Sequence, residues 1–114
     1  MGVEDQTEME NALAIIVAVE TYKEKTIKPV LFAEADAREF SEAMAALGIA
    51  SQEVLVNEDA TKSRIESLIK THLRRINADD QLFFFYAGHG FALNERNYIL
   101  ANDTLRADRI VFAS

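Results

Sequence analysis

The sequence predicts an α/β fold in which helices cover both faces of a mainly parallel sheet. Two continuous apolar runs, residues 12–19 and 81–87, lack the alternation of a half-exposed strand and are typical of strands covered on both faces. Two segments between these runs carry apolar residues at helical spacing. Such alternation of strands and helices favours right-handed βαβ crossovers and three layers.

Composition and charge narrow the class of protein. The 114 residues are 49% hydrophobic and 27% charged, which fits one soluble globular domain and excludes general disorder. The longest strongly apolar stretch is too short to cross a bilayer, and the acidic start is unlike a secretory signal, so we expect a cytoplasmic protein without a membrane partner. A net charge of −7 disfavours a nucleic-acid partner. The absence of cysteine excludes disulfides, thiolate metal sites and a cysteine nucleophile within this chain.

The first half of the chain predicts an arm, a strand, a loop and a helix. Residues 1–11 are polar and acidic, so we expect a flexible arm before the strand at 12–19. Residues 20–29 form a charged loop that contains the only proline. The helix runs from about Glu34 to Leu47, and one face of it is apolar, formed by Ala37, Phe40, Met44 and Leu47. Gly48 stands where the end of the helix needs a left-handed conformation.

The second half predicts a strand, a helix, a strand and a hairpin. A short strand at 53–56 precedes Thr61, which can cap a helix that continues through Ile76. The apolar face of this helix consists of Ile65, Leu68, Ile69, Leu73 and Ile76. After the strand at 81–87, residues 91–93 and 97–100 flank 94–96 as a small hairpin, whereas the tail from 101 to 114 has no clear period. Three parallel strands are few, so we expect further chain to complete the sheet.

His89 is the strongest candidate for chemistry. Ligands of open parallel sheets bind at the carboxyl ends of the strands, and His89 directly follows the third strand between two glycines. We expect its ring at the rim of the sheet, with Gly88 shaping the loop and the Gly90 N–H open to a developing oxyanion. The alternative is a tight turn that only exposes His89 to solvent.

The other candidate residues favour structural roles. His72 flanks the apolar face of the second helix, so we expect it to be half-buried or at the surface. Two histidines without thiolates do not make a zinc site, and no metal or cofactor is predicted. Capping best explains the acidic residues near helix ends, which are Glu58, Asp59, Asp79 and Asp80. The aromatic run at 83–86 is expected in the core.

The stretch Phe-Phe-Tyr-Ala-Gly-His-Gly at 84–90 resembles the strand and catalytic-histidine loop of caspase-like cysteine peptidases, the group of metacaspases and bacterial caspase homologues. The similarity runs from about residue 12 to 104. It includes residues 12–17 followed by Tyr22, which are similar to the opening strand of the family, and 31–37, which carry the Ala-x-x-Asp-Ala pattern of its first helix. Two shorter matches are Asp59-Ala60-Thr61 and Tyr98-Ile99-Leu100 with Asp103.

The resemblance implies a caspase-like three-layer sandwich, of which residues 12–114 are the amino-terminal part. It also implies a peptidase that cleaves protein or peptide substrates with a Cys-His dyad. His89 would be the general base and acid, and the Gly90 amide an oxyanion-hole donor. The family's cysteine lies on a further strand, so we expect this chain to be inactive alone and to need the rest of the domain as its partner. No cofactor is implied beyond the calcium dependence known in the family.

Specificity and alternative functions follow from two departures from the family pattern. Caspases hold an acidic P1 residue with an arginine, but the matching stretch here is Glu20-Thr21-Tyr22-Lys23, so we expect a basic P1 residue as in metacaspases. Without its cysteine the chain also fits a catalytically dead scaffold or interaction module. A receiver-like signalling domain would need an acceptor Asp where Gly88-His89-Gly90 stands.

Overall fold

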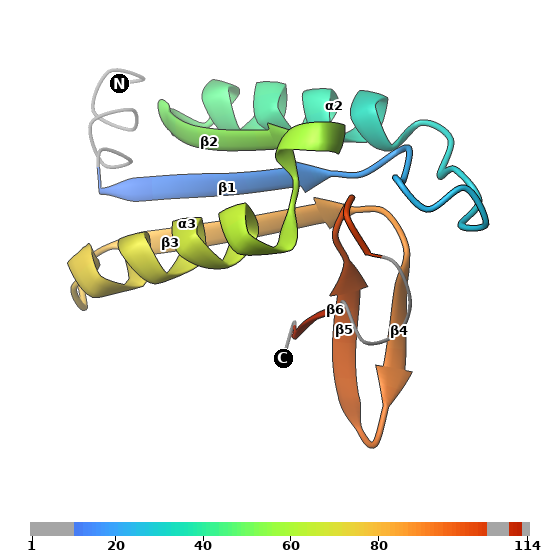
Figure 1. Ribbon diagram of the computed structural model, residues 1–114. Coiled ribbons are helices and arrows are strands. Elements are labelled where there is room, and N and C mark those ends of the chain that lie inside the picture. The colour runs from blue at the N-terminus through green and yellow to red at the C-terminus, as the bar shows by residue number, and fades with distance from the viewer. Residues whose placement is uncertain (1–10, 105–109, 113–114) are drawn as a thin grey trace.

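The structure is a computed structural model that describes residues 11–104 and 110–112 (Figure 1). The predicted arm lies outside the described residues except for Asn11, whose carbonyl oxygen accepts a hydrogen bond from the Gln81 amide at 3.0 Å. Along the chain follow β1 (Ala12–Ala18), α2 (Ala33–Ala46), β2 (Ser51–Val56), the 3₁₀-helix η1 (Asn57–Asp59), α3 (Lys62–Arg75), β3 (Gln81–Ala87), β4 (Gly90–Leu93), β5 (Arg96–Leu100) and β6 (Ile110–Phe112).

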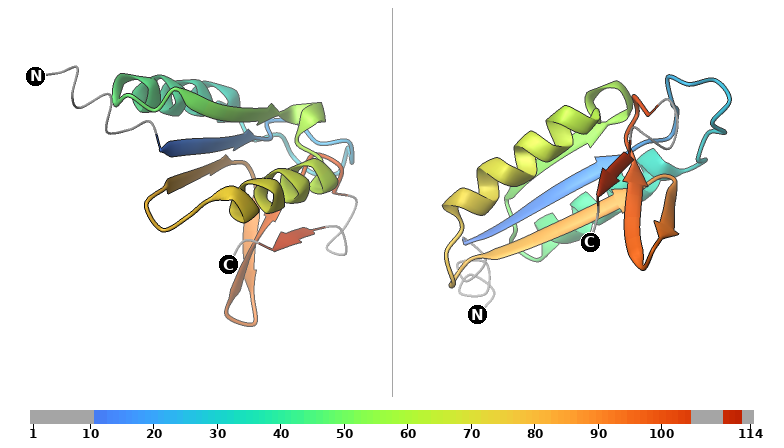
Figure 2. Two further views of the ribbon diagram at one scale, coloured as in Figure 1. Left: turned by 90° about the vertical axis from the view of Figure 1, so that its left-hand side faces the viewer. Right: turned by 60° about the horizontal axis from the view of Figure 1, so that its bottom comes forward.

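The main sheet is parallel and has the strand order β2-β1-β3. Its central strand β1 places Val17 opposite Leu55 of β2 and Tyr86 of β3. The crossover from β1 to β2 and the crossover from β2 to β3 run in opposite directions along the sheet. Crossovers of one hand then put α2 and α3 on opposite faces, which is the arrangement in Figure 2. The predicted α/β architecture with a mainly parallel sheet is therefore confirmed.

Two cores form because successive side chains of β1 point to opposite faces of the sheet. One set packs under α3 and the other packs under α2, together with Phe40, whose ring stacks on Phe85 at a centroid distance of 4.5 Å. The buried residues on the α3 side include Ile15, Val17, Val19 and Ile65, and those on the α2 side include Ala14, Ile16, Ala37 and Met44. Covering both faces explains why β1 is apolar without alternation.

The predicted helix signals are confirmed, with one error on each apolar face. Gly48 follows α2 with a φ of 92°, and the Thr61 hydroxyl oxygen accepts a hydrogen bond from the Arg64 amide at 3.3 Å. Leu47 was expected in the core but is 58% exposed, because α2 ends at Ala46 and the chain turns there. Leu73 is 54% exposed, because in the last turn of α3 its neighbour His72 faces β2 instead.

The predicted hairpin is part of a second, antiparallel sheet with the order β4-β5-β6 (Figure 1). Asn94 and Glu95 form its turn with φ of 53° and 65°, the conformation of a tight hairpin turn. Strand β6 pairs with β5 and places Val111 opposite Ile99. The sequence did not predict β6, because three residues are too few to show a period of two.

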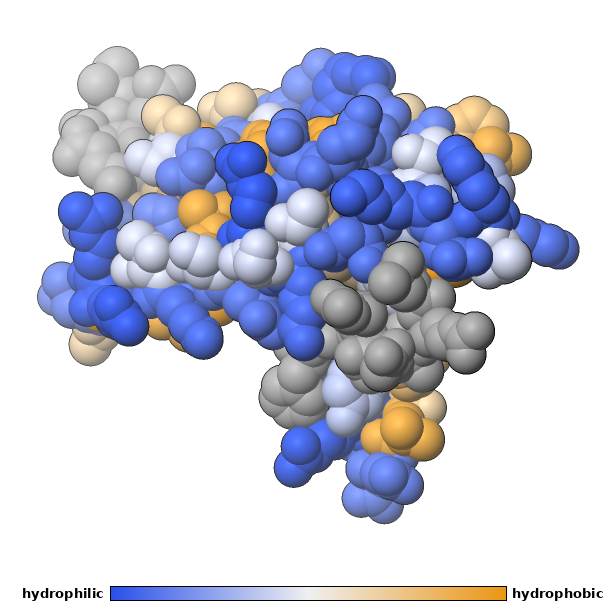
Figure 3. Space-filling view, in the orientation of Figure 1, coloured by the Kyte–Doolittle hydropathy of each residue, from blue (hydrophilic) through white to orange (hydrophobic). Residues whose placement is uncertain are grey.

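The surface of the described residues is largely polar. Hydrophilic residues dominate the face in Figure 3, and the apolar ones gather in small separate spots. Phe84 is 42% exposed, which corrects the expectation that the whole aromatic run of β3 lies in the core, because β3 is an outer strand of the described sheet. Across the described ranges, no helix combines the length and apolarity required to span a membrane.

Candidate active site

His89 lies at the carboxyl end of β3, where the loop after β1 and the end of β5 also meet (Figure 1). The loop after β1 provides Tyr22 and Lys28, and β5 provides Leu100. The half-buried imidazole contacts the ring of Tyr22 at a centroid distance of 5.5 Å and an interplanar angle of 35°. The predicted placement at the rim of the parallel sheet is therefore what the structure has.

A main-chain carbonyl orients the imidazole ring. The Nε2 atom of His89 lies 2.7 Å from the carbonyl oxygen of Lys28. A carbonyl oxygen only accepts hydrogen bonds, so Nε2 carries the hydrogen in this contact. In a neutral imidazole the lone pair is then on Nδ1, which is the basic atom of the ring.

Two tyrosine hydroxyls hold the main chain of His89. The amide of His89 donates to the Tyr22 hydroxyl at 2.9 Å. The Tyr86 hydroxyl lies 2.8 Å from the carbonyl oxygen of His89 and 2.7 Å from that of Leu100. The two hydroxyl oxygens are 3.3 Å apart. We call Tyr22 and Tyr86 the tyrosine pair.

The environment of Tyr86 keeps its hydroxyl protonated. Burial raises the pKa of Tyr86 far above its usual range, because the phenolate would lose its hydration. Tyr86 is therefore a hydrogen-bond donor at any physiological pH.

Both glycines of the histidine loop are required by close contacts. A Cβ atom on Gly88 would overlap the Tyr86 hydroxyl and lie 3.1 Å from that of Tyr22. On Gly90 it would lie 2.9 Å from the carbonyl oxygen of Tyr98. Gly90 is exposed and lies opposite Ile99 in the hairpin. The neighbouring pair, His89 and Leu100, is hydrogen-bonded, because the Leu100 amide donates to the His89 carbonyl. Bonded and non-bonded pairs alternate in an antiparallel ladder, so the Gly90 N–H points away from β5.

Asparagine side chains anchor the loop after β1. The Asn57 Oδ1 atom accepts from the amides of Glu20 at 2.8 Å and Thr21 at 3.2 Å, and its Nδ2 donates to Glu34 at 2.8 Å. Buried Asn102 donates to the Thr21 carbonyl at 2.8 Å. Sequence reasoning missed both asparagines, and the only available signal was their position near strand ends, Asn57 directly after β2 and Asn102 two residues after β5.

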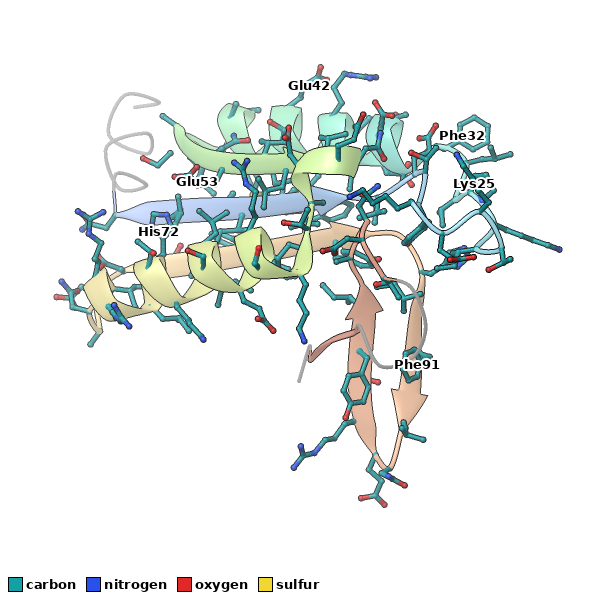
Figure 4. The ribbon with its side chains drawn as sticks, viewed as in Figure 1. Lys25, Phe32, Glu42, Glu53, His72 and Phe91 are labelled. Carbon is teal, nitrogen blue, oxygen red and sulfur yellow. The ribbon has the colours of Figure 1, made fainter. Side chains whose placement is uncertain are left out.

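Other predicted residues lie away from this loop. The Nε2 atom of His72 on α3 lies 3.4 Å from the carboxylate of Glu53 on β2 (Figure 4), which is the half-buried place expected for it. Both residues line a cavity of about 550 Å³ beside Ala12 and Gln81, at the other end of the sheet. In the described part of the chain, no group of three or more His, Cys, Asp or Glu could hold a metal ion.

The acidic residues near helix ends take part in local contacts. Asp59 forms an exposed ion pair with Arg64 at 4.0 Å. The Asp80 carboxylate accepts from the Asn77 amide at 2.9 Å in the turn before β3. Neither contact reaches the histidine loop.

A known protein family matches this chain. The family model of the caspase domain matches residues 11–111, which include the parallel sheet, both helices and the histidine loop. No curated protein matches the sequence significantly.

Proposed function

The chain belongs to the caspase domain family of peptidases, and on this basis we propose that His89 is the general base and acid of a cysteine endopeptidase. Because the 114 residues contain no cysteine, the proposed thiolate comes from polypeptide outside them. The chain alone is then inactive, and the complete domain hydrolyses peptide bonds.

The contact between Nε2 of His89 and the Lys28 carbonyl is the observation that carries the proposal. It leaves Nδ1 as the basic atom, and the same contact stabilises an imidazolium because its Nε2–H still has an acceptor. A catalytic base needs a fixed tautomer and a held orientation. The alternative reading of a solvated turn gives no reason for both ring and main chain to be held.

In each half of the proposed reaction, His89 takes up one proton and gives one back. Nδ1 of His89 takes the thiol proton, and the thiolate attacks the peptide carbonyl carbon. As the C–N bond breaks, the same proton passes from Nδ1 to the leaving amine. Water then hydrolyses the thioester, with Nδ1 taking the water proton and returning one to the thiol. The exposed Gly90 N–H donates to the carbonyl oxygen while it carries negative charge.

The preferred substrate in this proposal has a basic P1 residue. Residues 20–32 contain no arginine of the kind that holds an acidic P1 side chain in caspases. Peptides with Arg, Lys or Asp at P1 test this directly, and the proposal expects Asp to be the poorest of the three.

The decisive experiment compares the two histidines of the chain in the intact protein. His89→Ala should abolish cleavage, and His72→Ala should leave it unchanged because its contact with Glu53 lies at the other end of the sheet. Cleavage that persists in His89→Ala contradicts the proposal. An intact protein that neither cleaves nor carries a cysteine open to a thiol-directed label is the interaction module instead.

A further inference from the structure

We propose that the tyrosine pair positions the imidazole of His89, so that Tyr22 and Tyr86 are positioning residues of the reaction. The inference rests on the proposed function of His89. It concerns the hydroxyl groups, because both main-chain polar groups of His89 are bonded to them.

Counting protons fixes the direction of each hydrogen bond. The single hydroxyl proton of Tyr86 faces two carbonyl oxygens, those of His89 and Leu100, and is shared between them. Tyr86 therefore has no proton left for Tyr22, so the Tyr22 hydroxyl donates to the Tyr86 oxygen. Tyr22 in turn accepts the His89 amide proton. The result is a chain of hydrogen bonds that starts at the His89 N–H and ends at the His89 carbonyl.

This closed chain fixes the Cα position of His89 on both sides. The ring has little freedom left, because Tyr22 covers one side of it and the Lys28 carbonyl holds Nε2. A displacement of a catalytic group by about 1 Å can cost about a hundredfold in rate, so holding the main chain matters for turnover. Tyr22 thus orients His89 twice, by its hydroxyl and by its ring.

The surroundings of the pair are built for hydroxyl groups. Gly88 leaves the space that the Tyr86 hydroxyl occupies, and a Cβ there would overlap it. Burial keeps Tyr86 protonated, and only the protonated hydroxyl can donate to the two carbonyls. Phenylalanine at position 22 would keep the ring and leave the His89 amide without its acceptor, whereas phenylalanine at position 86 would leave the His89 carbonyl with the Leu100 amide as its remaining donor.

Removing one hydroxyl at a time in the intact protein tests the inference. Tyr22→Phe and Tyr86→Phe should each lower kcat about tenfold. KM should stay unchanged, because the imidazole of His89 acts in the chemical step and not in substrate binding. The matched control is Tyr98→Phe, which removes a tyrosine hydroxyl from the hairpin and should keep kcat. The ring of Tyr98 stacks on that of Phe91 at a centroid distance of 5.2 Å. Because the two hydroxyls belong to one chain of hydrogen bonds, the kcat of the double variant should be only a little lower than that of the less active single variant.

A second measurement does not depend on activity, and its first comparison needs only the wild-type protein. Hydrogen exchange of the His89 amide should be at least about tenfold slower than that of the exposed Gly90 amide, because Tyr22 accepts the first. Tyr22→Phe should remove this protection, and Tyr98→Phe should keep it. A His89 amide that exchanges as fast as Gly90 in the wild type overturns the inference, even if both variants fail to fold.

The outcomes separate the two proposals. Cleavage that depends on His89 but keeps its kcat in both tyrosine variants overturns the role of the pair alone. Cleavage that persists in His89→Ala overturns the proposed function itself. A higher KM with kcat unchanged would place the pair in substrate binding and would also contradict the positioning role.

Discussion

The Nε2 atom of His89 lies 2.7 Å from the carbonyl oxygen of Lys28, so the main chain of the loop after β1 orients a side chain at the end of β3. Lys28 directly precedes the only proline of the chain. A residue before proline is restricted to extended conformations, which limits the direction of its carbonyl group. Pro29 therefore helps to aim the acceptor that holds the imidazole.

Replacing this proline should weaken catalysis in the intact protein. Pro29→Ala frees the Lys28 carbonyl, and we expect kcat to fall roughly threefold to tenfold and the unfolding free energy by about 0.5 kcal/mol. Lys28→Ala is the control and should change neither, because the contact uses the main chain and the Lys28 side chain is exposed. Peptide-cleavage kinetics and urea unfolding measure both effects. A Pro29→Ala variant with wild-type kcat would contradict this account.

Gly88 should tolerate no side chain. In Gly88→Ala the new Cβ overlaps the Tyr86 hydroxyl, so we expect a loss of about 2 kcal/mol in unfolding free energy together with lost cleavage. Gly48→Ala is the matched control. At Gly48 alanine is strained by the backbone, whose φ is 92°, and not by a contact with the histidine loop, which is far away in sequence. The control should lose about 1 kcal/mol and keep kcat. Equal kcat in the two variants would show that the Gly88 contact does not matter to the site.

The side-chain hydrogen bonds of Asn57 should add to the stability that its left-handed backbone conformation requires of an asparagine. Asn57→Ala loses the acceptor of the Glu20 and Thr21 amides and the donor to Glu34, and we expect a loss of about 2–3 kcal/mol in chemical unfolding. Asn94 is also left-handed, with a φ of 53° against 51° for Asn57, but lies exposed in the hairpin turn. Asn94→Ala should therefore lose only the conformational part, about 1 kcal/mol. Similar losses in both variants would mean that the Asn57 side chain adds nothing.

The raised pKa of Tyr86 predicts a loss of stability in alkali. A tyrosine of the unfolded chain releases its proton near pH 10, while folded Tyr86 still holds its own. The folded state then binds more protons, so the unfolding free energy falls as pH rises above about 10, by about 1.4 kcal/mol per pH unit for this group. Tyr86→Phe lacks the hydroxyl that causes this loss. Urea unfolding between about pH 8 and 11 should show the gap between wild type and variant narrowing, and parallel curves would refute it.

Much of the fold follows from patterns along the sequence. The apolar run of β1 predicted a strand covered on both faces, and Thr61 and Gly48 marked helix ends, because these signals need only near neighbours. Leu47 and Leu73 were placed wrongly, since periodicity defines a face but not how far the neighbouring layer extends. The short strand β6 carries too little pattern to be recognised.

The candidate site was predicted only where its residues are adjacent in sequence. His89 and its glycines stand together after an apolar strand, and the structure places them at the sheet rim. The tyrosine pair joins residues 64 apart, and the Lys28 contact joins residues 61 apart. No spacing rule relates such positions, because the sheet order brings them together.

The central place of β1 also governs how the chain folds. Both partners of β1 come later in the sequence, β2 from Ser51 and β3 from Gln81. During synthesis the face of β1 that packs under α3 and the edge that pairs with β3 wait for these later segments to leave the ribosome, and pairing of distant segments is intrinsically slow. Newly made molecules should therefore expose an apolar face and an unpaired strand edge, both of which favour aggregation, until α3 and β3 are in place.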